Sequence, residues 1–154
     1  MIGDLGYNRR IRGTHIMTEI IDNGPAPLVT NIEKDTVENT NYRTTLWTGN
    51  KSQVTLMSIE PGHDIGLEIH NDNDQFLRIE QGNAAVSMGV DVDHMQEWQA
   101  GNGDAVIVPA GTWHNLVSCG DVSLKIYSIY SPAHHPQGTV HVTKEDADTD
   151  EAEE

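Results

Sequence analysis

Two glycine-anchored blocks of the sequence hold the side chains that could do chemistry. The first block is PGHDIGLEIHNDNDQFLRIEQG, residues 61–82, in which Glu68 and His70 lie two residues apart. Residues at this spacing leave the same face of a strand, so a carboxylate and an imidazole would lie side by side. Gln75 follows the polar turn NDND, and a tight antiparallel return would bring its amide level with that pair. The block therefore gathers three polar side chains in one place.

The second block is GDAVIVPAGTWHNLVS, residues 103–118. Pro109 and Gly111 end one expected strand, because proline cannot donate to a sheet ladder and glycine favours turns. His114 then begins the next strand. Together the two blocks offer one carboxylate, two imidazoles and one amide.

The elements that must position these side chains read as short strands. Six segments are rich in Val, Ile, Thr, Leu and aromatic residues, namely RTTLWT (43–48), SQVTLMSI (52–59), QFLRIE (75–80), AAVSMG (84–89), DAVIVP (104–109) and VSLKIYSIYS (122–131). Clusters of Gly, Asn, Asp and Pro separate them about every 8–12 residues, a spacing typical of a β-sandwich or barrel. One helix is predicted over about Asn31 to Asn39, with Asn31 as its N-cap. The pattern predicts an all-β fold, a barrel or jelly roll.

The two blocks resemble the two motifs of the cupin family. The residues at matching spacing are Gly62, Glu68, His70, Gln75 and Gly82 in the first block and Gly103, Pro109, Gly111 and His114 in the second. The resemblance covers about residues 40–131. The segments GLEIH, DQFLRI, VPAGTWHN and YSIYSPAHHPQGTVH extend it to about 27–146, toward small cupins labelled mannose-6-phosphate isomerase-like. It implies a single cupin jelly-roll barrel, a double-stranded β-helix.

The resemblance also implies a divalent metal ion inside the barrel, held by Glu68, His70, Gln75 and His114. The sequence departs from the family pattern, since Glu68 stands where a first His is usual and Gln75 where Glu is usual. The number of ligands and their charge are nevertheless retained. Such a set suits zinc, iron, manganese or nickel. Gln75 is either a ligand or a hydrogen-bond partner that orients a water at the metal.

We expect the protein to bind a small polar molecule, and three classes of function stay open for it. The first is a sugar or sugar-phosphate isomerase, in which a metal polarises adjacent oxygens and a base moves the α-proton. No base is evident beside Glu68, and the few Lys and Arg residues form no phosphate cradle. The second class is a metal-dependent oxygenase or lyase. The third is a cupin that binds a small ligand without catalysis, because fold alone does not fix function.

The composition of the chain limits the kinds of partner that it can bind. The chain has 154 residues and nine Lys plus Arg against 24 Asp plus Glu, for a net charge of −15. This charge argues against nucleic acid and anionic membranes, which both need a basic surface. No apolar run is long enough to span a membrane, no secretory signal is recognisable, and the single cysteine, Cys119, excludes an internal disulfide. We therefore expect a cytoplasmic protein, and the resemblance implies a homodimer that covers exposed strand edges.

Both ends of the chain differ from the middle. Residues 1–16 carry a net charge of +2, and we expect them to be an extension upstream of a natural start at Met17. Residues 17–143 form the expected cupin domain. Residues 144–154, KEDADTDEAEE, hold seven acids against one lysine, which predicts a disordered tail. His134 and His135 lie between two prolines, and we interpret them as part of an extended terminal arm.

Overall fold

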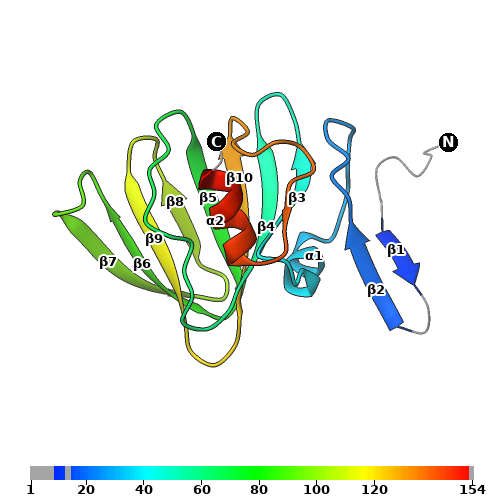
Figure 1. Ribbon diagram of the computed structural model, residues 1–154, viewed down its shortest axis with the longest axis horizontal. Coiled ribbons are helices and arrows are strands. Elements are labelled where there is room, and N and C mark those ends of the chain that lie inside the picture. The colour runs from blue at the N-terminus through cyan, green and yellow to red at the C-terminus, as the bar shows by residue number, and fades with distance from the viewer. Residues whose placement is uncertain (1–8, 13–14, 153–154) are drawn as a thin grey trace.

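Two antiparallel sheets make up the body of the computed structural model, which describes residues 9–12 and 15–152 (Figure 1). The larger sheet has the strand order β11-β3-β4-β10-β5-β8, and the smaller has the order β7-β6-β9. The strands of the larger sheet are β3 (Arg43–Thr48), β4 (Gln53–Ile59), β5 (Asp74–Gln81), β8 (Ala105–Val108), β10 (Leu124–Ser131) and β11 (Val140–His141). Those of the smaller sheet are β6 (Asn83–Gly89), β7 (Met95–Gly101) and β9 (Trp113–Cys119). The predicted all-β jelly roll is confirmed.

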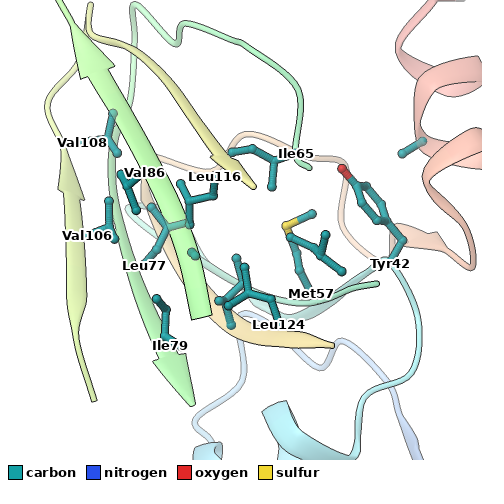
Figure 2. Close-up of a cluster of buried hydrophobic side chains, with 14 residues drawn as sticks. Tyr42, Met57, Ile65, Leu77, Ile79, Val86, Val106, Val108, Leu116 and Leu124 are labelled. Atoms are coloured by element: carbon teal, nitrogen blue, oxygen red, sulfur yellow. The ribbon is translucent and has the colours of Figure 1, made fainter. Parts of the chain in front are cut away.

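The hydrophobic core lies between the two sheets (Figure 2). In β5, Leu77 and Ile79 are buried while the residue between them is exposed. Val86 of β6 and Leu116 of β9 meet them from the smaller sheet. Burying an aliphatic side chain of this kind stabilises the fold by about 1.5–3 kcal/mol. His114 lies two residues before Leu116, so the same alternation turns its imidazole inward.

All six predicted strands are present, each with ends within two residues of the prediction. Strand β7 was not predicted, because its sequence MQEWQAG is mostly exposed and shows no apolar alternation. The strand expected around Glu68 and His70 is instead an extended segment that pairs with β9 through isolated bridges at Asp64 and Glu68. Gly66 interrupts a regular ladder there, because its φ of 86° is a conformation that favours glycine.

The two helices differ in how well the sequence predicts them. Helix α1 (Ile32–Glu38) begins as predicted, with the Asn31 side chain accepting a hydrogen bond from the Lys34 N–H at 3.1 Å. The predicted disorder of residues 144–154 is wrong over Lys144–Ala152, which form helix α2. Three contacts with the barrel explain its order. Ala147 packs into the core at 1% exposure, and carboxylates of α2 reach Arg43 and His141.

The N-terminal segment forms a separate hairpin. Strands β1 (Arg9–Arg12) and β2 (His15–Ile20) pair only with each other, and Figure 1 shows them to one side of the body. Residues 1–8 and 13–14 of the expected extension lie outside the described residues, so its origin stays a prediction. Within the described part of the chain, every helix is too short or too polar to cross a membrane.

Candidate metal centre

The backbone aligns Glu68 with His114. The segment before Glu68 runs antiparallel along β9, and the two residues exchange both backbone hydrogen bonds. The Glu68 N–H donates to the His114 carbonyl at 3.0 Å, and the His114 N–H donates to the Glu68 carbonyl at 2.9 Å. Directly paired residues of antiparallel strands project from the same face. The pairing therefore brings a carboxylate and an imidazole together from distant parts of the chain.

Three of the four predicted ligands converge. Oε1 of Glu68 lies 3.2 Å from Nε2 of His70 and 3.4 Å from Nε2 of His114. The three ligand atoms all lie within 4.8 Å of one another. Two atoms that each lie ~2.1 Å from one ion are about 3.0–3.4 Å apart at octahedral or tetrahedral angles. The arrangement is therefore a possible divalent metal site.

The chemistry of the two imidazoles fits a metal ion. Nε2 of His70 and Nε2 of His114 are both buried without a hydrogen-bond partner, which is costly unless another group satisfies them. Nδ1 of His114 lies 3.0 Å from the Thr112 carbonyl oxygen, and a carbonyl only accepts. Nδ1 of His114 therefore carries a ring hydrogen that it donates to Thr112, which is the orientation in which Nε2 can bind a metal ion at the site.

Glu68 supplies the negative charge of the site. Burial alone would raise the pKa of Glu68, but its close contacts with His114 and His70 outweigh burial and lower the pKa to about 2. The carboxylate is therefore ionised at any physiological pH. An ionised carboxylate beside two imidazoles is a set of ligands that binds a divalent cation.

Gln75, the fourth predicted ligand, faces inward from β5 and is 3% exposed. Its Nε2 donates to Oγ of Ser128 at 3.3 Å, which leaves its Oε1 buried without a hydrogen-bond partner. An unsatisfied amide oxygen suits either a metal ligand or a partner for a water. The choice between these roles for Gln75 stays a prediction.

A cavity of about 250 Å³ opens beside Glu68 and His70. Its other titratable lining residues are His134, His135, His141, Asp150 and Glu151. His134 and His135 were expected only as part of an extended terminal arm, yet both line this cavity, and the ring centroid of His134 lies 4.1 Å from that of His70. The signal that could have revealed them is the pair of histidines directly after the final long strand.

These two histidines lie in an environment that keeps them unprotonated. Burial, followed by the charge of Arg43, lowers the pKa of His135 to about 2. Burial and the neighbouring His70 also lower the pKa of His134. The structure therefore places neutral imidazoles beside the candidate metal centre.

Comparison with known proteins identifies the class. Residues 55–130 match the cupin domain family. The chain belongs to the cupin family. The uncharacterized protein YrkC of Bacillus subtilis (strain 168) is 55% identical to it over 127 residues, which cover 82% of this chain and 68% of YrkC. The finer resemblance to mannose-6-phosphate isomerase-like proteins stays a prediction.

Solved structures show the same fold. The crystal structure of BH2720 from Bacillus halodurans has a TM-score of 0.83 and 50% identity, and the match covers 84% of this chain and 99% of that one. Oxalate decarboxylase OxdC of Bacillus subtilis, which has Mn(II) centres, has a TM-score of 0.52 and 22% identity, covering 56% of this chain and 23% of that one. At such low identity the second similarity shows the fold alone.

Proposed function

We propose that this cupin is a metal-dependent enzyme that moves a proton on a small polar molecule, as an isomerase of a sugar-like compound does. The observation that carries the proposal is the convergence of Glu68, His70 and His114 beside a cavity of about 250 Å³. This volume lies below the ~300–1,000 Å³ of sites for drug-sized ligands. The cavity therefore suits a molecule of a few carbon atoms.

Different residues of the site would bind the metal ion and transfer the proton. A divalent ion held by Glu68, His70 and His114 would act as a Lewis acid toward carbonyl and hydroxyl oxygens. Glu68, as a ligand, is not free to serve as the base. His134 is the candidate for that role, because its partly exposed ring lines the same cavity next to His70 and its lowered pKa favours the unprotonated ring at neutral pH.

The test combines metal analysis with proton exchange. The full chain is purified and loaded with Zn²⁺ or Mn²⁺, and elemental analysis measures the bound metal. NMR in D₂O then follows the α-protons of a panel of three- to six-carbon aldoses and ketoses. We expect about one ion per chain and deuterium incorporation next to the carbonyl of at least one probe. His134→Gln should abolish the exchange and keep the metal.

The control variant is His63→Gln, since His63 is exposed, its ring lies 3.9 Å from a Glu60 carboxylate oxygen in a surface turn, and it does not line this cavity. It should change neither metal content nor exchange. A bound metal without exchange on any probe would contradict proton transfer. Iron in the purified protein together with O₂ consumption would support the oxygenase class instead. A chain that holds no divalent ion would contradict the proposal as a whole.

A further inference from the structure

Three carboxylates line the cavity beside the candidate metal centre, those of Glu68, Asp150 and Glu151. Asp150 and Glu151 come from the last turn of α2. Among the side chains that the structure describes, no Lys or Arg lines this cavity. His70, one of the candidate metal ligands, lines this cavity as well, and its buried Nε2 has no hydrogen-bond partner.

A chain of contacts that begins at Arg43 fixes the two α2 carboxylates. Nη1 of Arg43 lies 3.1 Å from Nδ1 of His141, and a guanidinium only donates, so Nδ1 is the acceptor. The ring hydrogen of His141 is therefore on Nε2, which donates to Oδ2 of Asp150 at 2.8 Å. Nη1 of Arg43 also lies 3.6 Å from Oε1 of Glu151.

This chain of contacts decides the charge of the cavity. Arg43 is only 3% exposed, so its guanidinium holds α2 in place from behind the lining and does not face a ligand. With a divalent ion bound, the three carboxylates that line the cavity leave the lining side chains with a net charge of about −1, and the compensating charge of Arg43 lies behind them. The Asp150 and Glu151 side chains are 53% and 47% exposed, so they repel an anion that enters the cavity and solvent ions partly screen this repulsion.

We propose that Asp150 and Glu151 are specificity-determining residues, which make the cavity select an uncharged, hydroxyl-bearing ligand over its phosphorylated counterpart. The inference rests on the proposed metal site and narrows its substrate class. The imidazoles of His134 and His135 complete the lining, and their ring nitrogens can form hydrogen bonds with a hydroxyl group. The carboxylates of α2 thus disfavour a negatively charged ligand in this cavity.

A matched pair of probes tests the proposal. Dihydroxyacetone and dihydroxyacetone phosphate differ only in the phosphate group, and Zn²⁺ keeps the loaded full chain suitable for NMR titration. We expect the wild-type chain to bind dihydroxyacetone at least tenfold more tightly than its phosphate. In the double variant Asp150→Asn/Glu151→Gln this preference should fall at least fivefold, through tighter binding of the phosphate.

The control is the double variant Glu145→Gln/Asp148→Asn. It makes the same change in net charge on the same helix, at two exposed residues that do not line this cavity, and should leave the preference unchanged. A second measurement needs no variant. The preference of the wild-type chain should shrink as NaCl rises from 20 to 500 mM, because salt screens charge repulsion.

Three results would overturn the inference: equal or tighter binding of the phosphate by the wild-type chain, binding of neither probe, or a control that loses as much preference as the cavity variant. Each of these is read on protein that has been shown to hold Zn²⁺. Failure to hold Zn²⁺ would instead count against the proposed function, so the two failures are distinguishable.

Discussion

Gln53 binds the backbone of His135 on both sides. Its Oε1 accepts hydrogen bonds from the N–H groups of His134 at 3.1 Å and His135 at 2.9 Å, and its Nε2 donates to the His135 carbonyl at 2.7 Å. Gln53 is the first residue of β4 in the larger sheet and is fully buried. One amide on the barrel therefore fixes the position of the two-histidine arm at the cavity.

Replacing Gln53 with Leu should release this arm. The substitution leaves three part-buried backbone groups of His134 and His135 without their side-chain partner, which should cost about 2–4 kcal/mol of stability. Urea denaturation measures this loss, and we expect metal affinity to be retained because Glu68, His70 and His114 are untouched. Gln96→Leu, on the exposed face of β7, should be nearly neutral. Equal stability of the two variants would show that the hydrogen bonds of Gln53 to the His134–His135 backbone contribute nothing to the stability of the fold.

Metal binding should depend on both imidazoles. His70→Ala or His114→Ala should reduce the bound metal from about one ion per chain to less than one tenth, because each removes a strong ligand. In the wild-type chain, Zn²⁺ at 100 times its dissociation constant should stabilise the fold by about 2.7 kcal/mol, and EDTA should reverse this. His94→Ala, on an exposed loop, is the control. Metal retention by both site variants would contradict the site.

Gln75→Glu should tighten metal binding at least tenfold if the amide oxygen is a ligand, because a second carboxylate adds negative charge next to the ion. The side chains are similar in size, and the buried Oε1 has no other partner that the substitution would disturb. Isothermal titration with Zn²⁺ gives the affinity. An unchanged affinity would assign Gln75 to orienting a water rather than to binding the ion.

Deleting residues 144–154 should destabilise the protein. The deletion exposes the core around Ala147 and removes the carboxylate that pairs with the buried Arg43. We expect a loss of about 2 kcal/mol, or roughly 4–8 °C in the melting temperature of a domain of this size. Differential scanning calorimetry measures the change. A midpoint within 1 °C of the full chain would show that α2 contributes no net stability.

Asp22 should make stability depend on pH. Burial alone would raise its pKa, but hydrogen bonds from Thr48, Gly24, Thr45 and Gly138 together lower it from 3.8. A carboxyl group whose pKa is lower in the folded state stabilises fully above its unfolded pKa and loses this effect as the pH falls through the folded value.

Asp22→Asn should therefore cost about 1 kcal/mol of stability at pH 7, because it removes the charge that strengthens these hydrogen bonds. The loss is no larger because Asp22 is partly exposed to solvent. The difference from the wild-type chain should shrink below about pH 4. Urea denaturation at pH 7, 5 and 3.5 checks this, with Asp93→Asn in an exposed loop as the control. A difference that stayed constant with pH would contradict the assignment.

The sequence by itself determined the strands and most of the candidate metal centre. Alternation of apolar and polar residues has a period of two in a strand, so the inward positions of Leu77 and His114 are local properties of the sequence. Glu68 and His70 project together for the same reason, although Gly66 keeps them out of a regular ladder. The spacing of the two blocks then carried the family resemblance.

The tertiary structure alone decided which residues of α2 and of the His134–His135 arm line the cavity. Nothing within KEDADTDEA predicts order, because its order comes from Arg43 and His141 on other elements and from a place in the core for Ala147. Likewise, His134 and His135 reach the cavity because a buried amide on β4 holds their backbone. Such contacts join residues that are distant in the chain, and no periodicity of the sequence encodes which buried partner a polar side chain will meet.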